Sequence, residues 1–160
     1  MAEKERVTLV VFSGELDKAL AAFNIAIGAA SMGMEVSMFF TFWGLNIIKK
    51  EKGPIHSRGV MRRMLNLMNR GGANRLHLSR FHMWGVGTWM MKRLMRDVNF
   101  PQVGELIAMA RELGVRFIVC TTSIGIMGLD KEAFIPEVDS WAGVATFLAE
   151  AREGGICLFV

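Results

Sequence analysis

Apolar runs of strand length alternate with segments of helical periodicity along most of the chain. Arg6 to Phe12 and Met34 to Phe40 are apolar runs, and the alanine-rich segment Glu15 to Met32 between them has the spacing of a buried helix. The alternation resumes with a helical segment from Pro101 to Leu113 and an apolar run from Val115 to Cys120. Strands that alternate with helices predict a mostly parallel sheet with helices on both faces.

Four further segments extend this pattern. They are a short helix over Leu45 to Lys52, a strand over Phe134 to Val138, a helix over Trp141 to Arg152 and a terminal strand over Ile156 to Val160. We therefore predict an α/β three-layer sandwich with a flavodoxin-like, mostly parallel sheet of about five strands. With 160 residues, of which 52% are hydrophobic, the chain can bury one core, and we expect a single domain over residues 1–160.

A segment of different composition, residues 53–100, interrupts the pattern after the second strand. Met61, Met64, Leu65 and Met68 recur at helical spacing, and a second apolar cluster surrounds Trp89, so we expect two short amphipathic helices joined by a glycine-containing loop. The segment holds seven of the thirteen methionines, and nine basic residues against one acidic residue. This composition predicts a contact surface, with a homo-oligomer or partner contact favoured over peripheral membrane contact, and no nucleic acid is expected.

Several function classes have little support in the sequence. The opening residues lack the pattern of a secretory signal and no segment has the length and hydropathy of a transmembrane helix, so we expect a cytoplasmic protein. The three histidines, His56, His77 and His82, lack the spacing of a helix-borne metal pair, and the first turn lacks a phosphate-binding motif. No metal and no organic cofactor is therefore expected.

The clearest candidate chemistry lies where the strand ending at Cys120 meets a turn. In a parallel α/β sheet, reacting groups collect at the carboxyl ends of the strands, where loops lead into helices. The next five residues offer hydroxyl and amide groups that favour a thiolate or persulfide anion: Thr121, Thr122, Ser123, Ile124 and Gly125. Because free cysteine is also among the most buried residue types, a purely structural Cys120 is the alternative.

Two other positions bear on this interpretation. Cys157 lies in an apolar run, ICLFV, and we expect it to be a core residue of a strand that is buried on both faces. Trp43 and Gly44 follow the second strand, where they are expected either to line a pocket at the carboxyl edge of the sheet or to belong to an aromatic core.

The stretch CTTSIGIMGL, from Cys120 to Leu129, resembles the cysteine loop of the DsrE/DsrF-like sulfur-relay family. Residues 7–50 and the closing segment WAGVATFLAEAREGGICLFV resemble the same family. The Met-rich insertion resembles that of a subgroup often labelled peroxiredoxin-like. Gly125 departs from the acidic or polar residue found in many relatives, so the resemblance implies no side-chain assistance at that position.

The resemblance implies a sulfurtransferase or sulfur carrier. Cys120 would hold sulfane sulfur as a persulfide and pass it from a protein or small-molecule donor to a thiol acceptor, without a cofactor. The basic insertion would then select the partner or shield the sulfur from water. The alternative is a non-catalytic binding or assembly module in which Cys120 is a buried structural residue.

Overall fold

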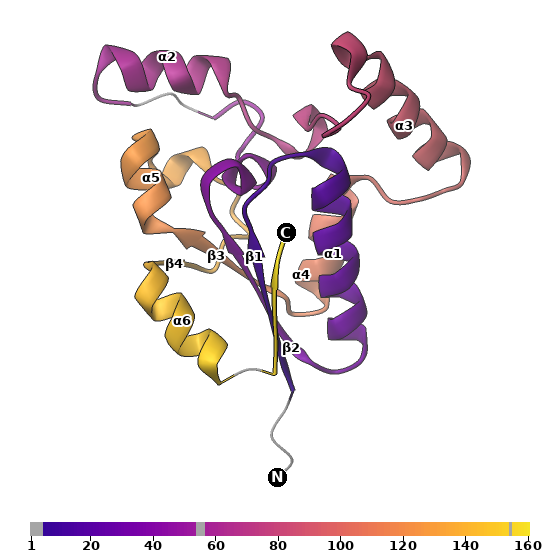
Figure 1. Cartoon of the computed structure of the whole chain (residues 1–160), viewed down its shortest axis with the longest axis vertical. Helices are drawn as coiled ribbons and strands as arrows, with labels where there is room; N and C mark the ends of the chain where they lie inside the picture. Colours follow the sequence, from indigo (N-terminus) through magenta and orange to yellow (C-terminus); the bar gives the residue numbers. More distant parts are fainter. Residues whose placement is uncertain (1–4, 54–56, 154) are drawn as a thin grey trace.

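The protein is a five-stranded, all-parallel sheet between two helical layers, as seen in a computed structural model that describes residues 5–53, 57–153 and 155–160. The strands are β1 (Arg6–Val11), β2 (Glu35–Phe40), β3 (Arg116–Cys120), β4 (Ser140–Ala142) and β5 (Ile156–Phe159). They are arranged in the order β4-β3-β2-β1-β5 (Figure 1). The α/β class and the parallel sheet predicted from the alternating pattern are confirmed.

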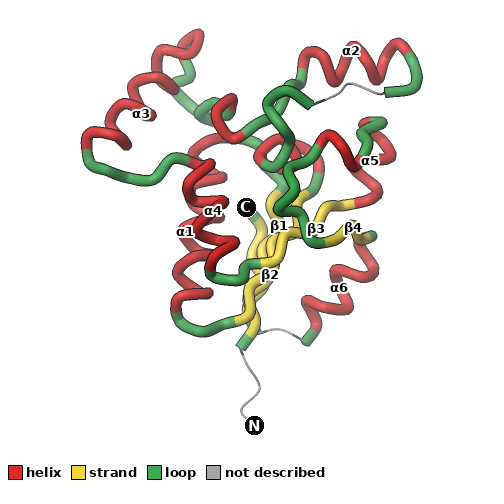
Figure 2. The backbone as a smooth tube through the Cα atoms, turned by 180° about the vertical axis from the view of Figure 1, so that it is seen from behind, coloured by secondary structure: helices red, strands yellow, loops and turns green. Residues whose placement is uncertain are grey.

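Two pairs of helices cover the faces of the sheet. Helices α1 (Leu16–Ser31) and α4 (Val103–Glu112) pack side by side on one face, while α5 (Thr121–Met127) and α6 (Val144–Arg152) lie on the other (Figures 1 and 2). An edge-to-face aromatic pair joins the first layer to the sheet, because Phe23 of α1 lies 5.9 Å from Phe117 of β3 between ring centroids. Phe117 makes a second edge-to-face pair within the sheet, at 5.5 Å from Phe40 of β2.

The segment between β2 and α4 lies beyond the carboxyl ends of the strands (Figure 1). It contains the 3-10 helices η1 (Phe42–Ile47), η2 (Ala73–Arg75) and η3 (Met83–Gly85), and the helices α2 (Val60–Met68) and α3 (Val86–Asp97). The α-helical parts are largely exposed: only Asn66 is buried in α2, and only Thr88 and Met95 in α3. No helix in the described part of the chain is long and apolar enough to cross a membrane.

The predicted strand over Phe134 to Val138 is wrong. Both of these residues are buried in the core, but they belong to a loop that follows the 3-10 helix η4 (Lys131–Ala133) and makes one isolated bridge to Lys49. The strand that pairs with β3 on the side away from β2 is β4, which is three residues long. Trp141 therefore lies in a strand, and α6 begins later than predicted. The residues from Phe134 to Val138 are therefore apolar because their loop is buried, not because they form a strand.

The predicted helix over Leu45 to Lys52 is also wrong, because the helical residues are the 3-10 turns of η1. Gly44 brings this turn close against the end of β1: a Cβ atom at this position would lie 2.0 Å from the carbonyl oxygen of Val11. Its amide donates to the carbonyl of Phe12 at 2.8 Å. Only glycine permits this approach, which folds the chain back before an α-helix can form.

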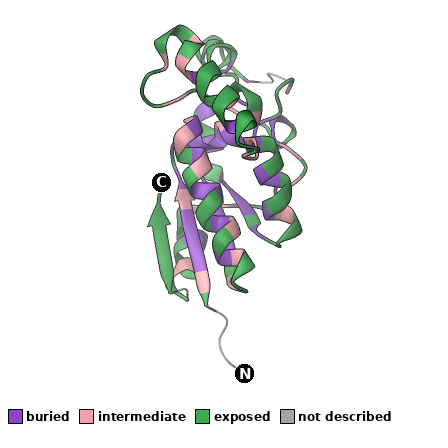
Figure 3. Cartoon of the chain, turned by 90° about the vertical axis from the view of Figure 1, so that its right-hand side faces the viewer, coloured by how far each residue is buried: buried purple, intermediate pink, exposed green. Residues whose placement is uncertain are grey.

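The expected burial of Cys157 is a third error. Strand β5 lies at the edge of the sheet beside β1, and each of its four residues is exposed (Figure 3). In the described part of the chain, α6 packs on the central strands through Phe147 and leaves β5 uncovered. An apolar run in the sequence is therefore the same for an edge strand as for a central strand, although the edge strand is exposed in the structure.

Candidate functional site

Cys120 is the last residue of β3 and the residue immediately before α5. Its backbone is extended, with φ −69° and ψ 114°, and the chain turns directly into the helix at Thr121. The Cys120 side chain is only 2% exposed and packs with Phe39, Ile118 and Phe147 on the face of the sheet covered by α6. The Cys120 thiol therefore lies at the carboxyl edge of the sheet, where it was predicted, but it is buried beneath neighbouring side chains.

Ser123, in the first turn of α5, connects the ends of two neighbouring strands. Its hydroxyl lies 2.8 Å from that of Thr41, which directly follows β2, and it accepts a hydrogen bond of 3.1 Å from the amide of Phe42. The Ser123 side chain is 1% exposed, so these bonds are shielded from water. The site thus contains donors from both the β2 and the β3 turns.

These groups shift the acidity of Cys120. Burial alone would raise its pKa, since a thiolate is poorly solvated in the interior. Hydrogen bonds from the Ser123 hydroxyl and amide, the Thr41 hydroxyl and the Thr122 amide outweigh burial and hold the pKa of Cys120 below its ordinary value. The arrangement therefore stabilises an anionic sulfur, which is the reactive form of cysteine.

An aromatic pair forms the cover over the sulfur. Phe147, from α6, stacks on Phe39, from β2, with ring centroids 4.4 Å apart and an interplanar angle of 25°. Among the residues that the structure describes, the hydrophobic cluster around Cys120 contains residues of the strands and of α6, and none from the insertion. In the described part of the chain, Phe147 of α6 packs in this cluster, and the expected shielding of the sulfur by methionines and tryptophans of residues 53–100 is not seen there.

The other predicted binding residues are only partly brought together. The Ser123 side chain and the Thr122 amide reach Cys120, whereas the side chains of Thr121 and Thr122 are exposed. Ile124 is buried in the main core, and Gly125 is exposed with open space around its Cα.

Trp43 and Gly44 lie apart from the sulfur. Trp43 lines a cavity of about 440 Å³ together with Phe12 and His77, and Cys120 is not part of that lining. Gly44 is a packing residue at the end of β1.

The prediction overlooked Thr41 and Phe147. The Thr41 hydroxyl, which follows β2, can reach Cys120 at the end of β3 only because the two strands are neighbours. The hydrophobic periodicity of the sequence does not show the order of the strands. The signal that could have revealed Thr41 is its position at a strand end, the same signal that singled out Cys120.

The described residues offer little for a metal ion. They contain no group of three or more His, Cys, Asp or Glu side chains placed to share one. The rings of His77 and His82 lie 4.5 Å apart within the insertion, where His82 Nδ1 is 3.0 Å from the Thr88 hydroxyl, while His56 lies outside the described residues.

Comparison with known proteins identifies the family. A profile of the DsrE/DsrF/DrsH-like family matches residues 3–159. The chain belongs to this family. The resemblance found in the cysteine loop is therefore confirmed over nearly the whole length.

Two curated proteins match the chain almost from end to end. The chain is 39% identical to the uncharacterized protein YrkE of Bacillus subtilis, covering 99% of this chain and 98% of that protein. It is 32% identical to the sulfur carrier protein DsrE2 of Allochromatium vinosum, covering 99% of each. A solved structure, the protein of unknown function MTH1491 from Methanobacterium thermoautotrophicum, matches with a TM-score of 0.56 at 12% identity, over 98% of this chain and 100% of that one. This last similarity shows the fold alone.

Proposed function

We propose that the protein is a sulfur carrier or sulfurtransferase that holds sulfane sulfur as a persulfide on Cys120. The observation that carries the proposal is the set of hydroxyl and amide donors, led by Ser123, that lowers the pKa of a cysteine at a carboxyl strand end. The family membership and the sulfur carrier DsrE2 of Allochromatium vinosum support a role in sulfur relay, with a protein or small-molecule donor and a thiol acceptor as partners.

The chemistry needs only thiol exchange. The Cys120 thiolate attacks the outer sulfur of a donor persulfide, R–S–SH, so that a new S–S bond forms as the donor S–S bond breaks and R–S⁻ leaves. An acceptor thiolate then attacks the outer sulfur in the same way and regenerates the Cys120 thiolate. Neither step is a net oxidation or reduction, and the donors that stabilise the thiolate also stabilise the persulfide anion.

The burial of Cys120 sets a condition on this function. With 2% of its surface exposed, the thiol meets a donor only when the residues packed around it open, and our candidate for the residue that opens is Phe147 of α6. In the loaded state the same residues would keep water and other thiols away from the persulfide. Burial also supports the alternative, a binding or assembly module in which Cys120 has a packing role.

Intact-mass analysis after incubation with polysulfide distinguishes the two functions. The protein and its Cys157→Ser variant should each gain sulfur on Cys120, and the Cys120→Ser variant should gain it only on the exposed Cys157. A small thiol should then remove the sulfur from Cys120. Loading confined to Cys157 under several donors would contradict the carrier function and leave the structural role for Cys120.

A further inference from the structure

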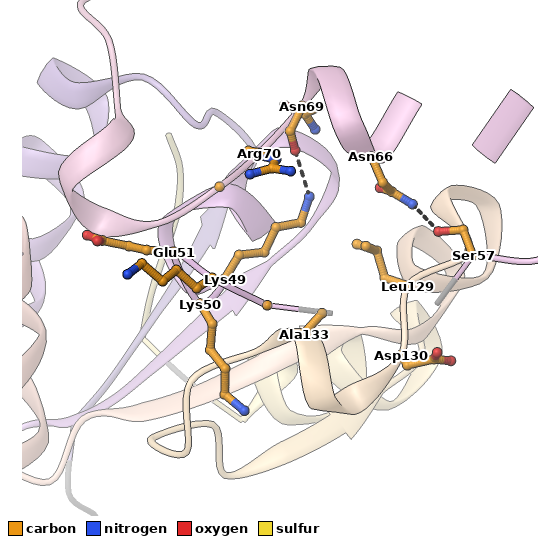
Figure 4. A pocket seen from close by; sticks show the side chains of 14 residues that line it. Lys49, Lys50, Glu51, Ser57, Asn66, Asn69, Arg70, Leu129, Asp130 and Ala133 are labelled. Atoms are coloured by element: carbon orange, nitrogen blue, oxygen red, sulfur yellow. Dashed lines mark hydrogen bonds between the residues drawn. The ribbon is translucent and has the colours of Figure 1, made fainter. Parts of the chain in front are cut away.

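A second polar site lies at the opposite end of α5 from Cys120. A cavity of about 280 Å³ opens between the chain that follows η1, helix α2 and the turn after α5 (Figure 4). Lys49, Asn66, Asn69, Arg70 and Leu129 are among the residues that line it. The function proposed above uses none of these residues.

Lys49 is a buried cation without an acidic partner. It is 6% exposed, and its Nζ donates to the Asn46 side-chain oxygen at 2.9 Å and to the Asn69 carbonyl at 3.4 Å (Figure 4). No carboxylate in residues 5–53, 57–153 or 155–160 forms an ion pair with it. Burial lowers its pKa to about 8, because the charged ammonium is poorly solvated. A buried lysine of this kind is stabilised by an anion.

Asn66, which also lines the cavity, has an unsatisfied acceptor. Its side chain is 5% exposed, and its amide nitrogen donates to the Ser57 hydroxyl at 2.5 Å and to the Met127 carbonyl at 2.9 Å. These two bonds fix the orientation of the amide. Its oxygen, Oδ1, is buried and has no hydrogen-bond partner among the described residues. A buried acceptor left in this way is costly, so its ligand should carry a donor.

The charges around the cavity favour an anion. Arg70 lies beside Lys49 in Figure 4, and Lys50 and Lys52 also line the wall. Of the two acidic residues in the lining, Glu51 accepts a hydrogen bond of 2.5 Å from Asn74 and Asp130 is exposed. Cations therefore outnumber carboxylates, and the buried cation is Lys49.

We propose that this cavity binds a small oxyanion that also carries an O–H group, such as hydrogen phosphate or a hydroxyl-bearing phosphate ester. The anionic oxygens would accept from Lys49 Nζ and from the Arg70 guanidinium, while the O–H would donate to Asn66 Oδ1. A simple counterion such as chloride carries no hydrogen-bond donor, so it would satisfy Lys49 but not Asn66 Oδ1. The site is independent of sulfur transfer, because Cys120 lies at the other end of α5.

Two inorganic anions test the proposal directly. At about pH 8, hydrogen phosphate and sulfate are both tetrahedral dianions, and only hydrogen phosphate can donate to Asn66 Oδ1. Isothermal titration of the intact protein should show saturable phosphate binding at one site, with sulfate at least fivefold weaker. Binding should be accompanied by proton uptake, detected as a dependence of the heat on the buffer, since a bound anion favours the charged form of Lys49.

Matched variants locate the site. Lys49→Met, which keeps most of the side-chain length, should weaken phosphate binding at least tenfold and abolish the proton uptake. Lys18→Met, at an exposed position of α1 outside the cavity, is the matched control and should change affinity less than threefold. If Lys49→Met does not fold, Arg70→Met provides the second measurement, because Arg70 is exposed. Its phosphate affinity should fall at least threefold.

Three outcomes would overturn the proposal. They are no saturable binding by the wild-type protein, equal affinity for the two anions, and unchanged phosphate affinity in the variants at Lys49 or Arg70. Loading of Cys120 with sulfur is measured separately by mass, so a failure here leaves the proposed function standing, and a failure of sulfur loading leaves this site standing.

Discussion

The Ser123 hydroxyl lies 2.8 Å from the Thr41 hydroxyl, so one hydrogen bond joins the turn after β3 to the turn after β2. Ser123 also accepts from the Phe42 amide. Both residues, Thr41 and Ser123, also lower the pKa of Cys120, Ser123 in part through its backbone amide, so the reactivity of the thiol depends on the pairing of two strands as well as on its own loop. The consequence can be measured at each of the residues involved.

Replacing Ser123 by Ala should raise the pKa of Cys120, because the largest hydrogen-bond contribution to the thiolate is removed while burial remains. The pH profile of alkylation should move to higher pH in a Cys157→Ser background. Stability should fall by about 1 kcal/mol, since the Phe42 amide loses its acceptor in a part-buried hydrogen bond. Thr122→Ala is the control, because Thr122 reaches Cys120 through its backbone amide and its side chain is exposed. A profile unchanged by Ser123→Ala would exclude this role.

Replacing Phe147 by Ala should uncover the sulfur. The ring is 4% exposed and stacks on Phe39, so its loss should lower the free energy of unfolding by about 3 kcal/mol. Alkylation of Cys120 at fixed pH should become at least tenfold faster, and a persulfide on Cys120 should be lost to solvent thiols more rapidly. Leu148→Ala, at an exposed position of the same helix, should alter neither rate. Equal alkylation rates for Phe147→Ala and wild type would show that another element controls access.

The buried charge of Lys49 predicts a rise in stability with pH. Its pKa is near 8 in the folded protein and near 10.5 when exposed, so between these values the unfolded chain holds a proton that the folded chain has lost. The free energy of unfolding should therefore increase across this window, by on the order of 3 kcal/mol for this residue. Denaturant titrations of Lys49→Met should lack that increase. An identical pH dependence in both proteins would contradict the assignment.

Sequence patterns predicted the parts of the fold whose burial repeats locally. The strands β1, β2 and β3 are apolar because helices cover both faces, and α4 begins at Val103 rather than at Pro101 because Glu105 accepts from the Gln102 amide at 2.7 Å. Whether a strand lies at the edge of the sheet cannot be inferred from the residues of that strand alone. The apolar residues of β5 therefore gave no sign that Cys157 is exposed, and those near Phe134 resembled a strand although they are a buried loop.

The candidate site was predictable to a similar extent. Cys120 and Ser123 stand together in the sequence, so their association could be inferred from a single turn. The order of the strands brings Thr41 to the Cys120 site, and the packing of α6 brings Phe147 there. The fold of the insertion brings Lys49 and Asn66 to the separate cavity. Lys49 stands in a basic run of the sequence, which is typical of exposed residues, and only the fold shows that its ammonium group is buried.

The exposed apolar surface of the insertion predicts self-association. Phe81, Met83 and Trp84 are at least 65% exposed around η3, and Trp89 in α3 is 62% exposed. Large apolar side chains that are exposed next to one another mark contact surfaces, so we expect a homo-oligomer. Light scattering should show more than one copy at micromolar concentration, and Trp84→Ser should weaken the association at least tenfold. A wild-type monomer under these conditions would refute the prediction.

The basic residues of the insertion predict a salt-dependent partner contact. Arg62 and Arg63 are both exposed on α2, but the Arg62 side chain lies close to Gly128, where a Cβ atom would be 2.7 Å from Arg62 Cδ. Arg63→Ser is therefore the cleaner change. Sulfur loading by an anionic donor, or binding of an acidic acceptor, should slow about threefold at low salt and approach the wild-type rate at high salt. A defect that is equal at both salt concentrations would indicate altered packing instead.

The exposed edge at β5 has a practical consequence for handling the protein. Cys157 lies on a strand whose outer backbone groups have no partner strand in the described part of the chain, and the neighbouring Phe159 is 71% exposed. Two copies that meet along this edge would place their thiols close together, so storage in air should produce covalent dimers on non-reducing gels, and Cys157→Ser should not form them. Purification under reductant, removed just before sulfur loading, would keep such cross-linked material from being mistaken for a native assembly.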